Sequence, residues 1–392
     1  MIAPVRRTAR VIPLLVLLLH HRAIAQGVER FTLTRDLRID AATADFGSAG
    51  PMLIGRNGEI VVVEDKDNIL RTFSAAGVAG TIGRVGEGPG EFRNLTRTGW
   101  LGDSLWTLDP NLNRVSIFGP NHKFVRSFLM PSTIVSPKAP KDSAETVTEI
   151  YVQAALSDGS LRAIAGFRPT HRPSWAVGVD SGATLMVRIT PTGVLRNRVT
   201  VDPPNKCEVN FVTPGGTGGF HIPFCAERVS TEWDGSQVVA SADLEPATGA
   251  GARYRITVAG EDGTTQFSRV YPFVPVPVSA ASRDSVVAAR LKAFARYGQG
   301  FIDAMPKILP AKTYPPVRRI VLGRDGTVWV EERIAASGHF WRILDAKGVV
   351  LGTVSLPADV SLARADAHTL WGYETDADGL QGVVRFRLER GR

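Results

Sequence analysis

The feature that most constrains this fold is a short unit that recurs along the chain. A tight Asn-Gly or Asp-Gly turn leads into an apolar, β-rich run at residues 55–64 (GRNG, then EIVVVE) and again at 323–332 (GRDG, then TVWVEE). Such a turn beside apolar residues is a strong hairpin signal. The same unit recurs, less sharply, at 102–109, 157–165, 233–241 and 366–374. Regular recurrence of this kind is typical of repeat architectures.

The segments that follow these units complete the architecture. Five units are followed by another apolar run and a turn, but the last one ends with residues 383–388 near the carboxyl end, one strand short. Residues 31–39 (FTLTRDLRI) can supply that strand, and a ring closed in this way leaves no sheet edge exposed at the closure. The sequence therefore predicts an all-β, six-bladed β-propeller with four-stranded antiparallel blades, whose N-terminal strand closes the last blade. A β-sandwich would explain the alternation but not the six-fold recurrence.

One segment departs from the strand pattern. Residues 282–297 carry Val287, Leu291 and Phe294 at helical spacing. Ser282 is the predicted N-cap and Gly298 the stop. We expect a helical insertion at about 280–300 between the fourth and fifth units. The proline-rich segment that follows should lie across one face of the ring, where it packs or shapes a binding mouth.

The first residues have the pattern of an export signal. Arginines precede the apolar run 11–19, and Ala-Ile-Ala follows at 23–25. Because a membrane span needs roughly 20 apolar residues, this run predicts no membrane anchor. We expect a signal peptide at 1–25, a single propeller domain at 28–392, and a periplasmic or secreted protein.

Charge and cysteine content narrow the function classes. The formal net charge is +8, from 46 basic and 38 acidic residues; without the four arginines of residues 1–25 it is 42 minus 38, or +4. That excess forms no Lys/Arg blocks, so nucleic-acid binding is not expected. The two cysteines, Cys207 and Cys225, are predicted to form a disulfide in an oxidising compartment. The alternative, a zinc site, needs more ligands than these thiols and His221.

Two stretches resemble a known repeat. Residues 105–109 (LWTLD) followed by Asn113-Arg114-Val115 match the pattern of NHL-repeat propellers closely, as does the Gly-Glu-Phe entry at 90–92. The region from the helix through YPPV (314–317) to GRDGTVWVEE looks like exported bacterial six-bladed propellers of largely unassigned function. The resemblance covers nearly all of the mature chain and implies the same fold.

The glycine-rich stretch 83–92 (GRVGEGPGEF) has two possible interpretations. A phosphate-binding loop would end in Gly-Lys-Ser/Thr, which is missing here, and the glycines do not have dinucleotide-binding spacing. We therefore predict a connector from the outer strand of one blade to the inner strand of the next, with Phe92 wedged between blades.

Four acids recur at the end of the second strand of their units, and Ala165 and Ser241 take the other two places. The acids are Glu64, Asp109, Glu332 and Glu374. In one interpretation each carboxylate accepts hydrogen bonds from the following turn. In the other the four form a negative collar around the channel mouth and bind a cation, for which calcium would be the fitting metal.

Catalytic motifs are missing from the sequence. The mature histidines are isolated, and no Gly-x-Ser-x-Gly elbow occurs in a plausible context. Trp106, Trp329 and Trp371 occupy equivalent positions, where they are predicted to pack between sheets or, alternatively, to stack on sugars. The leading hypothesis is a monomeric module without a cofactor that binds a protein, small molecule or glycan. The alternative is a metal-dependent, lactonase-like hydrolase or lyase.

Overall fold

The structure is a computed structural model that describes residues 29–74, 77–136, 149–166, 183–213, 215–226, 229–232, 238–246, 251–335 and 338–391. The predicted signal peptide (1–25) and the turn of the fourth unit (233–237) lie outside the described residues.

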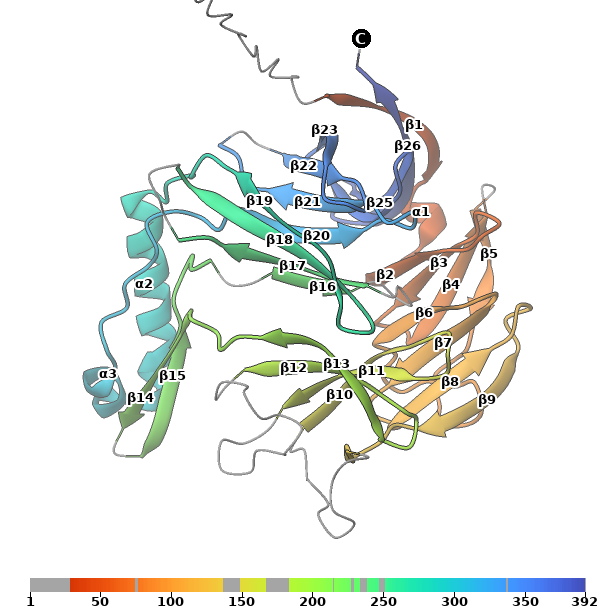
Figure 1. Cartoon of the computed structure of the whole chain (residues 1–392), viewed down its shortest axis with the longest axis horizontal. Coiled ribbons are helices and arrows are strands. Elements are labelled where there is room, and N and C mark those ends of the chain that lie inside the picture. The colour runs from red at the N-terminus through yellow and green to blue at the C-terminus, as the bar shows by residue number, and fades with distance from the viewer. Residues whose placement is uncertain are drawn as a thin grey trace, which may run out of the picture.

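Six four-stranded antiparallel sheets form the body of the molecule, as predicted (Figure 1). Blades 1 and 2 contain β2 (Ala49–Ile54), β3 (Ile60–Glu64), β4 (Ile69–Ser74), β5 (Gly77–Ile82), and β6 (Arg97–Leu101), β7 (Ser104–Asp109), β8 (Arg114–Phe118), β9 (Phe124–Leu129). Blades 3 and 4 contain β10 (Glu149–Ala155), β11 (Leu161–Gly166), β12 (Thr184–Ile189), β13 (Leu195–Asp202), and β16 (Val229–Glu232), β17 (Val238–Leu244), β18 (Arg253–Gly260), β19 (Thr265–Pro272). Blades 5 and 6 contain β20 (Val317–Leu322), β21 (Val328–Glu332), β22 (His339–Leu344), β23 (Val350–Leu356), and β24 (Val360–Ala365), β25 (Thr369–Thr375), β26 (Gln381–Arg390) with β1 (Phe31–Ile39).

The N-terminal strand closes the ring, which confirms the prediction for residues 31–39. β1 pairs antiparallel with β26, from Phe31 opposite Arg390 to Ile39 opposite Val383. The short helix α1 (Ala41–Ala44) then leads into blade 1. Because both ends of the described chain share one sheet, separating blades 1 and 6 would require breaking a backbone ladder.

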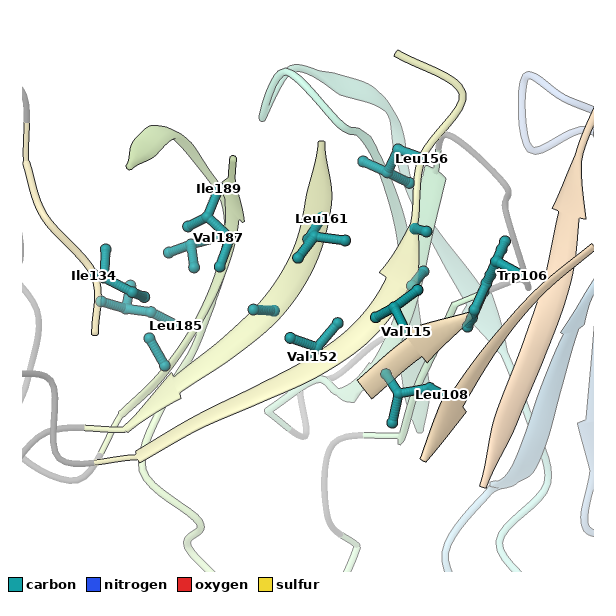
Figure 2. Close-up of a cluster of buried hydrophobic side chains, with 14 of the residues drawn as sticks. Trp106, Leu108, Val115, Ile134, Val152, Leu156, Leu161, Leu185, Val187 and Ile189 are labelled. Atoms are coloured by element: carbon teal, nitrogen blue, oxygen red, sulfur yellow. The ribbon is translucent and has the colours of Figure 1, made fainter. Parts of the chain in front are cut away.

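Buried apolar side chains fill the interfaces between blades. Between blades 2 and 3, Trp106 and Leu108 meet Val152, Leu161 and their neighbours, as Figure 2 shows. The other two recurrent tryptophans also lie between sheets, Trp329 between blades 5 and 6 and Trp371 between blades 6 and 1. The predicted packing role of these tryptophans is therefore confirmed.

The connector prediction for residues 83–92 is also confirmed. This stretch runs from β5, the outer strand of blade 1, to β6, the inner strand of blade 2. Phe92 is fully buried among apolar residues of both blades. Gly83 has φ +79°, and a Cβ at this position would lie 2.1 Å from the Phe92 ring, so only glycine fits.

An inserted module lies beside blades 3 and 4 (Figure 1). It consists of the hairpin β14 (Glu208–Thr213) and β15 (Gly216–His221), the helices α2 (Ala280–Phe294) and α3 (Gln299–Ala304), and the 3-10 turn Ala295–Tyr297. The predicted disulfide between Cys207 and Cys225 closes the base of the hairpin, with a Cα–Cα distance of 5.6 Å. Val287 and Phe294 pack against the hairpin, whereas Leu291 is 39% exposed.

The predicted N-cap of the helix is wrong by three residues. Ser279, not Ser282, has the extended backbone of a cap (φ −61°, ψ 152°), and its hydroxyl accepts a hydrogen bond from the Ser282 N–H. Ser282 is thus the residue whose amide is capped. Two serines three residues apart look alike as caps in the sequence, so the pattern alone favours neither.

Candidate functional site: an arginine-lined cavity in the central channel

A cavity of about 630 Å³ lies against the inner strands β16, β20, β24 and β2 of blades 4, 5, 6 and 1. Its lining residues are Ala49, Gly50, Pro51, Met52, Val229, Arg318, Arg319, Ile320, Val321, Leu322, Ser361, Leu362, Ala363, Arg364, Tyr373 and Gln381. Ten of the sixteen lining residues are apolar or glycine, but polar atoms make up slightly more than half of the exposed wall, and the charged side chains are three arginines. A concave site that combines apolar residues with a few placed polar groups is the usual form of a small-molecule site.

The inner strands are irregular where they face this cavity. In β20, Val317 pairs with Glu332 and Arg319 with Glu331, so Arg318 is an extra residue in a β-bulge. Ala363 is the extra residue of β24, and the β2 ladder skips between Ala49 and Met52. Because a bulge turns side chains out of the regular alternation, adjacent residues Arg318 and Arg319 can both line the same cavity.

The arginines of blade 5 share one carboxylate. Arg318 Nη1 lies 3.4 Å from Glu331 Oε1, and Arg319 Nε lies 3.5 Å from Glu331 Oε2. The arginine side chains are 40% and 41% exposed, whereas that of Glu331 is only 5% exposed. The guanidinium groups therefore remain accessible in front of a buried counter-ion.

Glu331 has a third basic neighbour. His339 Nδ1, at the start of β22, lies 2.7 Å from Glu331 Oε1. The order from the cavity outward is thus arginine, carboxylate, imidazole. A carboxylate that holds one ring nitrogen of a histidine fixes the orientation of that ring.

Desolvation and like charges act together at Arg319. Burial, together with the positive charges of Arg318 and Arg364, lowers the pKa of Arg319 below its ordinary value despite the opposing effect of Glu331. The Arg319 Nε is buried and has no hydrogen-bond acceptor in the described part of the chain. The guanidinium also stacks on Trp341 at 5.2 Å from the ring centroid. An anion in the cavity would relieve the repulsion among these cations and could accept their hydrogen bonds.

The opposite wall, from blades 6 and 1, is less charged. The Tyr373 hydroxyl donates to the Gly50 carbonyl at 2.8 Å, and burial raises the pKa of Tyr373 well above its ordinary value. Asp65 lies close to Gly50, since a Cβ on that glycine would meet Asp65 Oδ1 at 2.7 Å. Burial raises the pKa of Asp65. Asp65, which adjoins this wall beside Gly50, is therefore held in a position that disfavours its charge.

The structure places the four sequence-predicted acids in four different blades, at the ends of their second strands. Glu64 accepts the Gly47 N–H at 2.7 Å and contacts Arg71. Asp109 accepts backbone N–H groups of Arg93 at 2.7 Å and Leu112 at 3.0 Å. Both carboxylates therefore already have donors.

The other two acids are bonded mainly to side chains. Glu332 contacts the Tyr254 hydroxyl and accepts from Arg342 Nε at 2.8 Å. Glu374 accepts from Arg38 Nε at 2.7 Å and contacts Arg35. None of the four lines the cavity, and the fold does not bring them together. Within the described residues there is no cluster of three or more His, Cys, Asp or Glu side chains that could hold a metal ion.

Sequence reasoning missed Arg318, Arg319, Arg364, Glu331 and His339. The only available signal was a pair of adjacent arginines at 318–319 in an otherwise apolar inner strand (VRRIVL). In a regular strand, adjacent side chains point to opposite faces of the sheet. The two arginines therefore could not be assigned to one cavity before the β-bulge was known.

Comparisons with known proteins find solved structures of low similarity. No protein-family model matches the chain, and no curated protein matches it in sequence. A member of the DUF4221 family from Bacteroides vulgatus matches with TM-score 0.47 and 9% identity over 92% of this chain and 99% of that one. A protein from Bacteroides fragilis described as exported matches with TM-score 0.43 and 9% identity over 94% and 97%. A catalytically inactive virginiamycin B lyase from Staphylococcus aureus, solved with quinupristin, matches with TM-score 0.41 and 12% identity over 92% and 100%. At such identities the likeness concerns the fold alone.

Within the described residues, no helix combines the length and apolar character needed to cross a bilayer.

Proposed function

We propose that the protein is a ligand-binding β-propeller whose central cavity takes a small anionic molecule. The observation that carries this proposal is the placement of Arg318, Arg319 and Arg364 on a cavity of about 630 Å³. Guanidinium groups bind carboxylate and phosphate oxygens in pairs of parallel hydrogen bonds. The apolar remainder of the wall would contact the body of the ligand and limit its size.

The charge balance around the cavity supports an anion rather than a cation. Three arginines line it, and the acid in contact with two of them, Glu331, is also in contact with His339. The effective attraction in such a partly enclosed site exceeds that at an open surface, because solvent screens the charges less.

The test is calorimetric titration with inorganic phosphate, sugar phosphates, mono- and dicarboxylates, and neutral sugars as the comparison. Arg364→Gln should weaken binding of the best anion by about tenfold or more, the range expected for one charge-assisted contact. Arg56→Gln is the matched control, since Arg56 is 77% exposed and pairs only weakly with Asp103 at 3.2 Å. Equal binding of neutral sugars, or unchanged anion binding in Arg364→Gln, would overturn the proposal.

We propose further that the protein works as a monomer outside the cytoplasm and is related to NHL-repeat propellers. The support is the disulfide between Cys207 and Cys225, the signal-like pattern of residues 1–25, and the repeat pattern at 105–115. A protein partner or a glycan remains the alternative kind of ligand.

The metal-dependent hydrolase or lyase is the second hypothesis, with Glu64, Asp109, Glu332 and Glu374 as its candidate ligands and calcium as its candidate metal. Elemental analysis of the purified protein tests it: stoichiometric metal that is lost in Asp109→Asn or Glu332→Gln would favour the enzyme. The arginine and amide donors already bonded to these carboxylates favour the anion-binding proposal instead.

A further inference from the structure

Behind the arginines that line the cavity lie two groups that the binding proposal does not use. Glu331 is almost fully buried and reaches two cavity arginines and one histidine with the same carboxylate. Its contact to His339 is the shortest of the three, 2.7 Å against 3.4 and 3.5 Å. The carboxylate of Glu331 can therefore pair either with the two arginines or with His339.

An anion that enters the cavity would compete with Glu331 for Arg318 and Arg319. With a neutral imidazole, Glu331 can compensate its charge only with the arginines, whose nitrogens lie 3.4 and 3.5 Å from its carboxylate oxygens, and this attraction opposes the binding of a ligand to them. With a protonated imidazole, a complete ion pair forms between Glu331 and His339. The two guanidinium groups are then free to bind the ligand.

We propose that Glu331 is an internal competitor for the anion site and that His339 controls it, so that anion binding in the channel strengthens when His339 takes up a proton. This inference rests on the anion-binding function proposed above and adds its regulation. Histidine is the side chain whose charge ordinarily changes between about pH 5 and 8, and the experiment below scans that range.

The charged surroundings of His339 give the sign of the effect. Among the described residues, the charged groups that act on Glu331 beside His339 are Arg318, Arg319 and Arg333. Arg364, across the blade interface, acts on Arg319. On the other side β23 presents Leu356 opposite His339 and contributes no charge there. Glu331 is thus the acid in direct contact, and a proton on His339 adds positive charge to a site that is already cationic. An anion therefore gains affinity as the pH falls.

Reciprocity gives a second, independent readout. If a proton on His339 strengthens anion binding, a bound anion must strengthen proton binding by the same factor. The His339 ring should then titrate at higher pH when the site is filled. His122 is the matched internal control, because it also faces a glutamate, with Nε2 at 3.4 Å from Glu59 Oε2, and is 25% exposed against 22% for His339. It is not among the residues that line the cavity.

The experiment uses the full mature chain and sulfate, which remains doubly charged throughout the range. Between about pH 8 and 5.5 the sulfate affinity should rise roughly tenfold in the wild type, a typical coupling between two sites. His339→Gln should abolish most of this rise. Glu331→Gln should bind sulfate tightly at both pH values. His122→Gln should behave like the wild type.

Nuclear magnetic resonance of the histidine rings completes the test. Saturating sulfate should move the titration midpoint of His339 upward and leave that of His122 in place. If sulfate binds and depends on Arg364, but affinity and the His339 midpoint do not change together, the inference fails and the anion-binding function stands. If neither sulfate nor any anion of the earlier panel binds at either pH, both fail.

Discussion

Two neighbouring blade interfaces of this propeller are built in different ways. Between blades 2 and 3 the described residues form a large apolar cluster around Trp106, Leu108 and Leu161. Between blades 3 and 4 the corresponding cluster of described residues has Met186, Val199 and Val239 as its buried members. The comparison shows that neighbouring blades of one propeller can be joined either by apolar packing or by specific polar contacts.

A buried ion pair joins blades 3 and 4. Arg162 of β11 is fully buried, and its Nε donates to Glu261 Oε1 at 2.6 Å. Glu261 belongs to the turn between β18 and β19, so the bond crosses from one blade to the other. The side chain of Asn197 also donates to the Glu261 carbonyl, at 2.7 Å. A charge pair of this kind fixes geometry but contributes less net stability than a packed core of the same volume.

The largest effect is expected from the apolar interface. Trp106→Ala should lower the free energy of unfolding by about 4 kcal/mol, because it removes a fully buried tryptophan and leaves a cavity. The ring of Trp106 also covers Gly99 on the neighbouring strand, where a Cβ would lie 2.6 Å from the indole nitrogen. Gly99→Ala should therefore destabilise the same interface through a clash, by about 1–3 kcal/mol.

Chemical denaturation of both variants checks this prediction. A loss below about 1 kcal/mol for Trp106→Ala would mean that this cluster is not what holds blades 2 and 3 together. Leu309→Ala serves as the surface control, since Leu309 is 65% exposed.

The polar interface should respond to single and paired changes in opposite ways. Arg162→Met alone should cost about 3 kcal/mol, because it removes a buried guanidinium that contacts the buried carboxylate of Glu261. The double variant Arg162→Met, Glu261→Leu should recover most of that loss, since two apolar side chains can fill the same space. A double-mutant cycle measures the coupling directly.

If the double variant were as unstable as the single one, the polar contacts would contribute more than charge compensation. The polar interface between blades 3 and 4 would then contribute to stability itself, and not only to the geometry with which the two blades meet.

The sequence predicts the apolar half of this comparison well and the polar half poorly. Turn dipeptides and alternation are local signals, so the blades, the closing strand 31–39 and the packing of Trp106 were all predictable. Arg162 and Glu261 are separated by 99 residues, and no local pattern relates them. The prediction of a disulfide between Cys207 and Cys225 succeeded because the chain offers only one pair.

The candidate site was hidden for a related reason. Glu64 and Asp109 were predicted as site residues because they recur at equivalent places. Such recurrence identifies residues that stabilise the repeat itself. The arginines at 318, 319 and 364 do not recur, and their common direction depends on bulges in β20 and β24. A binding site that belongs to only a few blades is formed by residues that differ from the repeat, so the repeat pattern does not predict it.

A third prediction concerns the inserted module, which has its own small core outside the ring. Cys207→Ala with Cys225→Ala should destabilise the hairpin β14–β15 by roughly 2–3 kcal/mol, the value expected for a closed loop with a sequence separation of 18. Because the described residues that pack on Phe211 and Phe220 belong to the hairpin, to α2 and α3 and to the segment that follows them, hydrogen exchange should increase in the module only. Equal loss of protection in blades 3 and 4 would contradict a separate module.

The smallest effect should appear at two similar turns on either side of the interface between blades 3 and 4. In blade 3, Asp158 accepts from the Ser160 N–H at 3.0 Å and contacts Arg188. In blade 4, Asp262 accepts from the Thr264 N–H at 2.9 Å. Within the described residues it forms no ion pair with an arginine, although the charge of Arg188 also lowers its pKa. Burial alone would raise the pKa of Asp158, but its bonds to Ser160 and Arg188 outweigh burial and hold the pKa at about 2.

A carboxyl group whose pKa is lowered on folding stabilises the protein above its unfolded pKa of about 3.9, and this contribution disappears as the pH falls through the folded value. The wild type should therefore lose stability between about pH 4 and pH 2, and Asp158→Asn should lose less over that window. Since Asp158 is 37% exposed, solvent screening reduces the expected difference to roughly 1 kcal/mol at neutral pH. Unfolding measured at both ends of the window checks this, with Asp262→Asn as the comparison. Because the ion pairs of Asp158 with Arg188 and Arg196 distinguish the two turns, an equal effect of both variants would show that these ion pairs add nothing to the turn itself.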